Sequence, residues 1–192
     1  MSLGVPQLGV SVDAWLSAPF GFLEMVEVVD GAFVIKKVGG NPHHFIATSL
    51  LIEFERQWGV VATAPGNWAV ELAPDGSVVR GRIPDVLVDG DELRSVDVYV
   101  GVPAAAVEVW SPGNTLREMN EKRGEYREAG LPVLLEAFLS DSGDVHLSWM
   151  VNVGSHWSTV VASEGESPLV VPARPGGHAA FSVVPNALLR RR

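Results

Sequence analysis

The chain of 192 residues contains no cysteine, which excludes disulfide bonds, thiol nucleophiles and thiolate zinc sites. It also lacks a long apolar run: the most apolar segment, residues 98–110, is too short to span a bilayer and includes Glu108. Residues 1–9 lack the basic start and apolar centre of a signal peptide. We therefore expect a cytoplasmic protein with no membrane partner.

Positive charge is also scarce. Lys and Arg number 14 against 23 Asp and Glu, which gives a formal net charge of −9. This balance argues against broad, non-specific nucleic-acid binding, which depends on a surplus of Lys and Arg. It is compatible with a local basic groove, because a nuclease also needs acidic metal ligands. Among the cations near or within residues 83–130 are Arg80, Arg82, Arg117, Lys122, Arg123 and Arg127.

Apolar residues make up 47% of the chain and charged residues 19%, which is typical of a globular chain that can bury a core. We find no repeat and no linker, so we predict one domain over residues 1–192. Hydrophobic periodicity, turn signals and caps predict the following elements. They are a hairpin over 24–35, a helix over 43–58, strands at 60–64, 67–72, 83–88 and 104–110, a helix over 115–129, and strands at 133–139, 145–151 and 157–162. This order predicts an α+β, or mixed α/β, fold built on one sheet.

Two carboxylates stand in apolar strands. Asp85, taken alone, is a strand-entry carboxylate that would face water. Glu108 lies between Val107 and Val109, where an unpaired charge would be strongly destabilising. Mg²⁺ takes hard oxygen ligands, usually one or two carboxylates with carbonyl, water and phosphate oxygens. Asp85, Glu108 and the Val109 carbonyl would supply such a site. A Glu108 satisfied by Lys or Arg is the structural alternative.

Five short motifs occur in order between residues 27 and 130. They are Glu27-x-x-x-Gly31, His43 followed by Ile46, Leu50 and Phe54, Pro84-Asp85, Glu108-Val109-Trp110-Ser111-Pro112, and Glu118, Lys122, Tyr126 and Gly130 at intervals of four. Together these motifs resemble those of the Uma-two family of bacterial proteins, which are described as restriction-endonuclease-like and belong to the PD-(D/E)XK nuclease superfamily. The resemblance covers roughly residues 20–140.

The resemblance implies a restriction-endonuclease-like core, with a central mixed sheet flanked by helices and added β-hairpins. It implies Mg²⁺- or Mn²⁺-dependent hydrolysis of DNA, with Asp85 and Glu108 as metal ligands and catalytic residues. Trp110 occupies the position of the (D/E)XK lysine, so the resemblance implies that this catalytic role has moved to Lys122. The accessory site residues would be His43, Glu27 and Tyr126.

The helical spacing adds a geometric expectation. Met119, Lys122, Tyr126 and Ala129 follow one another at intervals of three, four and three, so they share one face. This predicts that Lys122 faces Glu108. A lysine whose stem covers apolar surface while its head reaches water is the alternative.

Two further questions stay open at this stage. The acidic net charge and the missing in-line lysine also suit a catalytically inactive nuclease-fold binding or regulatory module. A homodimer is plausible because one small domain covers little DNA, although no residue specifies it.

Overall fold

The computed structural model describes residues 9–18, 24–37, 39–111, 113–173 and 178–190, so Pro112 of the fourth motif lies outside the described residues. The chain divides into two compact units, and each is described by itself. The first unit comprises Met1–Val38, Asn67–Ile83 and Asp97–Gly101, and the second comprises Gly39–Gly66, Pro84–Val96 and Val102–Arg192. The expectation of one domain did not anticipate this division and stays a prediction.

The first unit is built on a sheet with the strand order β2-β1-β5-β4-β7. Its elements are α1 (Val12–Leu16), β1 (Glu24–Val29), β2 (Ala32–Lys37), β4 (Trp68–Leu72), β5 (Val78–Arg82) and β7 (Tyr99–Val100). The predicted hairpin is confirmed: β1 pairs antiparallel with β2 about Asp30 and Gly31, which both have positive φ, as a tight turn between strands requires. Trp15, Val28 and Val78 are buried in the small core of this unit.

The second unit carries a sheet of six strands, in the order β11-β10-β9-β8-β6-β3. Its strands are β3 (Val61–Thr63), β6 (Val86–Asp89), β8 (Ala105–Trp110), β9 (Val133–Leu139), β10 (Val145–Asn152) and β11 (Trp157–Glu164), with a separate pair β12 (Leu169–Val171) and β13 (Phe181–Val183). β8 and β9 are parallel, whereas the other neighbouring strands are antiparallel. The predicted mixed α/β fold with a central mixed sheet is therefore confirmed. The prediction of one sheet is wrong, because the described strands form two larger sheets and a separate two-stranded one.

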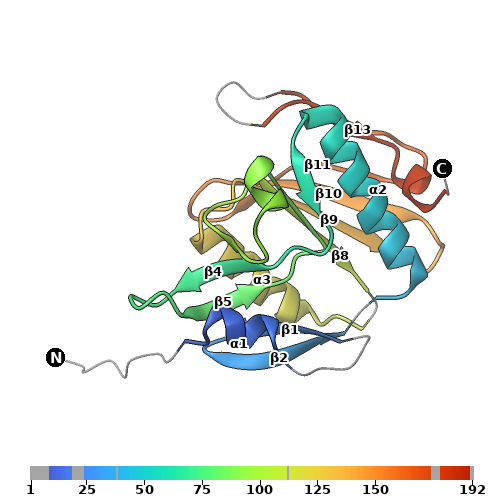
Figure 1. Ribbon diagram of the computed structural model, residues 1–192. Helices are drawn as coiled ribbons and strands as arrows, with labels where there is room; N and C mark the ends of the chain where they lie inside the picture. The colour runs from blue at the N-terminus through green and yellow to red at the C-terminus, as the bar shows by residue number, and fades with distance from the viewer. Residues whose placement is uncertain (1–8, 19–23, 38, 112, 174–177, 191–192) are drawn as a thin grey trace. The chain divides into compact units, whose positions relative to one another are not determined.

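Two helices cover opposite faces of this sheet. On one face lies α2 (Asn41–Trp58), as Figure 1 shows. It buries Ile46, Leu50 and Phe54 against the odd-numbered residues of β8 and β9. Side chains alternate across a strand, so the even-numbered residues of β8 and β9 point to the other face. There they meet α3 (Leu116–Glu128). The remaining helical turns of the unit are η1 (Asp91–Arg94) and η2 (Pro185–Leu189).

Several element boundaries differ from the sequence prediction. β6 begins at Val86 and not at residue 83, so Asp85 precedes the strand. α2 begins two residues earlier than predicted, because Pro42 is tolerated in a first helical turn. β5, β7 and β12 were not predicted. β3 and β4 are joined by a short turn but belong to different sheets, since local patterns do not specify the strand with which each one pairs.

The ends of α3 were predicted correctly. Thr115 accepts a hydrogen bond from the backbone N–H of Glu118 and caps the start, and Gly130 adopts a positive φ after the end. Within the described part of the chain, no helix has the length and hydropathy needed to cross a membrane.

Candidate functional site

The prediction placed Asp85 and Glu108 on neighbouring strands; Glu108 lies on β8, whereas Asp85 directly precedes the neighbouring strand β6. The register of β6 on β8 pairs Val86 with Val107, and the Asp85 N–H donates to the Val107 carbonyl at 3.0 Å. The Asp85 Oδ2 then accepts a hydrogen bond from the N–H of Val109 at 2.7 Å. The Asp85 carboxylate is therefore fixed directly beside the strand position that follows Glu108.

Glu108 is 1% exposed and points from β8 toward α3. Its Oε1 lies 3.3 Å from the Lys122 Nζ and accepts a hydrogen bond from the Tyr126 hydroxyl at 2.6 Å. Lys122 is 2% exposed, so its head does not reach water, and the predicted inward placement is observed. A buried carboxylate is costly unless it is paired and hydrogen-bonded. Lys122 and Tyr126, one helical turn apart on α3, supply the ion pair and the hydrogen bond that Glu108 requires.

His43 contacts Asp85 directly. Its Nε2 lies 3.1 Å from the Asp85 Oδ1, and its Nδ1 lies 3.4 Å from the Ser111 Oγ. The side chains of His43 and Asp85 are 13% and 8% exposed, so both are largely shielded from water. The sequence predicted His43 as an accessory residue but gave no partner for it and no role for Ser111. The contact of His43 with Ser111 joins the first turn of α2 to the loop after β8.

That loop is fixed at its start. The Asn114 Oδ1 accepts a hydrogen bond from the Ser111 N–H at 2.8 Å, and the Asn114 N–H donates to the Ser111 carbonyl at 2.9 Å. The Asn114 amide also donates to the Glu118 carboxylate at 3.2 Å. The connection between Glu108 on β8 and Lys122 on α3 is thus short and internally bonded, which holds the two charged residues in one arrangement.

A third carboxylate, which the sequence reasoning missed, lies on the same face of the sheet. Glu136 of β9 is in register with Glu108 in the parallel pair, so the two side chains point to the same side. Arg123 holds Glu136 with two nitrogens, and its Nε lies 2.6 Å from the Glu136 Oε1. The hydrogen bond to Glu136 raises the pKa of the Arg123 guanidinium. The signal was available, because Glu136 stands in an apolar strand as Glu108 does.

Glu27 belongs to the first unit. It is buried, whereas a hairpin carboxylate is usually solvated. Its Oε2 lies 2.8 Å from the Arg82 guanidinium, and its Oε1 accepts a hydrogen bond from the Ile83 N–H at 3.2 Å. Glu27 therefore fixes the end of β5, and its predicted accessory role in the site stays a prediction.

The donor set suits a hard divalent cation. Two buried carboxylates, Asp85 and Glu108, flank the backbone of Val109, and oxygen donors of this kind are what Mg²⁺ and Mn²⁺ prefer. Within the described residues, no three His, Cys, Asp or Glu side chains form a group that could hold a metal ion. Since Mg²⁺ is usually bound through only one or two carboxylates, with water and substrate phosphates as further ligands, a pair fits the ion.

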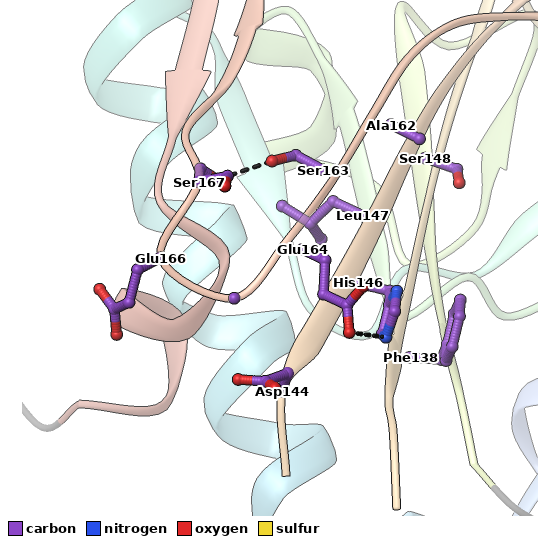
Figure 2. Close-up of a pocket in the computed structure, with 11 residues that line it drawn as sticks. Phe138, Asp144, His146, Leu147, Ser148, Ala162, Ser163, Glu164, Glu166 and Ser167 are labelled. Carbon is purple, nitrogen blue, oxygen red and sulfur yellow. Dashed lines mark hydrogen bonds and ion pairs between the residues drawn. The ribbon is translucent and has the colours of Figure 1, made fainter. Parts of the chain in front are cut away.

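A separate depression of about 720 Å³ lies at one end of β10 and β11, where Phe138 stacks on His146 (Figure 2). Its polar side chains contact residues of the same unit. His146 pairs with Glu164 at 2.7 Å, and the Ser163 hydroxyl donates to the Ser167 carbonyl at 2.6 Å, as Figure 2 shows. Asp85, Glu108 and Lys122 do not line this depression. It is distinct from the candidate site.

Comparison with known proteins places the chain in a family. Residues 15–180 match the Uma2 family, described as "Putative restriction endonuclease", and the chain belongs to this family. The chain also matches a solved structure with a TM-score of 0.65 and 11% sequence identity. The match covers 94% of this chain and 99% of the chain in that structure. That structure is described as a putative nuclease belonging to DUF820 from Anabaena variabilis ATCC 29413, and the likeness shows a shared fold. A search of curated proteins found no match.

Proposed function

We propose that the protein is a metal-dependent endonuclease of the PD-(D/E)XK type, which hydrolyses phosphodiester bonds in DNA. The observation that carries the proposal is the buried Glu108–Lys122 pair, with Asp85, directly before the neighbouring strand, fixed by the N–H of Val109. The family description and the shared fold support the same class of activity.

Asp85 and Glu108 would hold Mg²⁺ or Mn²⁺, with the Val109 carbonyl as a further oxygen donor. The bound ion would supply Lewis-acid polarisation of the scissile phosphate. Lys122, an ammonium held in a water-poor site, would offset the negative charge that develops on the phosphate and would orient the attacking water. Tyr126 keeps the Glu108 carboxylate in place through its hydroxyl. The reaction would be an in-line attack by water without a covalent enzyme intermediate.

Cleavage of supercoiled and linear DNA in Mg²⁺, in Mn²⁺ and with a chelator tests the proposal. We expect Asp85→Asn, Glu108→Gln and Lys122→Met each to lower the rate by about 100-fold or more, as for loss of other preorganised charged groups. Glu164→Gln is the matched control, because Glu164 pairs with His146 in the separate depression and should leave the rate unchanged. A wild-type protein that neither cleaves nucleic acid nor binds either metal would refute the proposal.

A second candidate is a catalytically inactive nuclease-fold module that binds DNA or regulates another protein. The contacts of Glu108 with Lys122 and Tyr126 favour it, since they stabilise the carboxylate without a metal. The net charge of −9 and Trp110 at the in-line lysine position point the same way. DNA retained in a gel-shift assay, without cleavage in either metal, would identify this second function.

A further inference from the structure

The side chains of His43 and Ser111 extend the site beyond the groups that would touch metal or substrate. His43 stands in the first turn of α2, a position where a histidine is usually at the surface. Here its ring lies between two polar groups, with Nε2 at 3.1 Å from Asp85 Oδ1 and Nδ1 at 3.4 Å from Ser111 Oγ. Asp85 and Ser111 belong to different segments, and His43 links them.

The chemistry of the three groups determines which group donates and which accepts in the two hydrogen bonds. An ionised carboxylate only accepts hydrogen bonds, so the proton between His43 and Asp85 belongs to Nε2. A neutral imidazole carries one N–H, and Nδ1 is then an acceptor. The Ser111 hydroxyl can therefore donate to Nδ1. One tautomer satisfies all three residues, and the contact with Asp85 selects it, because an ionised carboxylate only accepts whereas a hydroxyl can donate or accept.

The backbone also makes room for this ring orientation. A Cβ atom added to Gly39 would overlap the Cβ, Cγ and Nδ1 atoms of His43. These atoms are not the far end of a flexible side chain, so they cannot move aside without moving the whole ring. Gly39 thus leaves room for the His43 ring to reach Asp85. The backbone conformation of Gly39 does not itself require glycine.

We infer that His43 and Ser111 are positioning residues that fix the orientation of the Asp85 carboxylate through the chain Ser111 Oγ–H to His43 Nδ1 and His43 Nε2–H to Asp85 Oδ1. The other carboxylate oxygen accepts from the Val109 N–H at 2.7 Å. Rotation of the carboxylate would disrupt both contacts, so its remaining lone pairs point in fixed directions. Partners of this outer kind typically alter metal affinity or activity by about 10–100-fold when removed.

Two readouts test the inference without metal and without catalysis. Two-bond ¹H–¹⁵N correlation spectra of the imidazole rings report the tautomer of His43, and amide hydrogen exchange of Val109 reports the hold on Asp85. We expect the Nε2–H tautomer in the wild type. Ser111→Ala should keep this tautomer, because Asp85 still requires the proton on Nε2, and should speed Val109 exchange roughly fivefold, the ratio for loss of one ordinary hydrogen bond. Ser111→Thr, which keeps the hydroxyl, should restore the wild-type exchange rate.

A matched control and a second variant make the result decisive. Ser155 lies 3.0 Å from the Nδ1 of His156 in an exposed pair, so Ser155→Ala should change neither the His43 tautomer nor Val109 exchange. Gly39→Ala displaces the ring from both Asp85 and Ser111 without removing a polar group, so it should speed Val109 exchange and should also convert the His43 tautomer to a mixture. An Nδ1–H tautomer in the wild type, or unchanged Val109 exchange in Ser111→Ala, would overturn the inference.

A third readout rests on the proposed function. In calorimetric titrations with Mn²⁺, Ser111→Ala should weaken binding by about tenfold or more, because an outer contact of the ligand is lost, while Ser155→Ala should bind as the wild type does. Unchanged Mn²⁺ affinity in Ser111→Ala contradicts the inference. A wild type that binds no Mn²⁺ refutes the metal-dependent function instead, and the tautomer and exchange results then decide the inference alone.

Discussion

The Glu108 Oε1 receives two contacts from one face of α3, from the Lys122 Nζ at 3.3 Å and from the Tyr126 hydroxyl at 2.6 Å. All three side chains are essentially excluded from water. The arrangement compensates a charge that the strand would otherwise bury alone. Under the proposed function it would also place an ammonium beside a carboxylate that holds the metal ion, so stability and activity would be coupled at this pair.

The first prediction concerns Lys122→Met. Removing one partner of a buried ion pair leaves an uncompensated charge, so we expect the free energy of unfolding to fall by about 3–5 kcal/mol. Urea unfolding measures this loss. Glu108→Gln in the same background should recover much of it, because the orphaned charge is removed. Lys122→Arg should restore little, since a planar guanidinium does not replace a compact ammonium. Strictly additive effects of Lys122→Met and Glu108→Gln would contradict the coupling.

The second prediction separates packing from hydrogen bonding at Tyr126. The Tyr126→Phe variant keeps the ring in the core and removes only the hydroxyl. Hydrogen bonds to charged groups contribute about 1.5–3 kcal/mol, so we expect a loss of that size in chemical unfolding. In the Glu108→Gln background the same substitution should cost clearly less, because the acceptor is neutral. An equal cost in both backgrounds would show that the hydroxyl is not acting through Glu108.

These contacts show which parts of the site the sequence could specify. Glu108 stands in an apolar strand, a short loop follows, and α3 has a clear cap, so the approach of Lys122 was predictable from neighbouring residues. The contact of His43 with Ser111 spans 68 positions, and no local pattern encodes it. Glu136 carried the same signal as Glu108 but lay outside the motifs. Pairing between strands decided the division into two units, and periodicity does not report pairing.

The third prediction compares two buried tryptophans. The Trp110 Nε1 is buried and has no hydrogen-bond partner in the described structure, whereas the Trp68 Nε1 donates to the Gly101 carbonyl at 2.8 Å. Trp110→Phe and Trp68→Phe remove similar volumes, but only the second breaks a hydrogen bond and leaves a carbonyl without its donor. We expect Trp68→Phe to cost at least about 1 kcal/mol more in urea unfolding. Equal costs would show that an N–H donor matters equally at the two positions.

The last prediction concerns acid stability at Asp144, beside the depression shown in Figure 2. The Asn186 side chain donates to the Asp144 carboxylate at 2.8 Å, and the Ser142 hydroxyl donates to it at 3.2 Å. These hydrogen bonds, the one from Asn186 first, lower the pKa of Asp144, and nearby His146 lowers it further. A carboxyl whose pKa is lower in the folded state binds its proton less readily there than in the unfolded chain. Its stabilising effect is therefore complete above the unfolded pKa of about 3.9 and is lost as the pH falls through the folded value.

Asp144→Asn should accordingly lose less stability than the wild type when urea unfolding at about pH 5 is compared with unfolding at about pH 3, on either side of the ordinary carboxyl pKa. The quantity compared is the change between the two pH values, so a uniform loss of stability in the variant does not affect it. Asn186→Ala removes the largest cause of the lowered pKa and should also reduce the acid-dependent loss, although it keeps the carboxylate. If both variants lose as much stability as the wild type over this interval, Asp144 does not contribute to the acid response, and its hydrogen bonds serve only to hold the turn before β10 against Asn186 of η2.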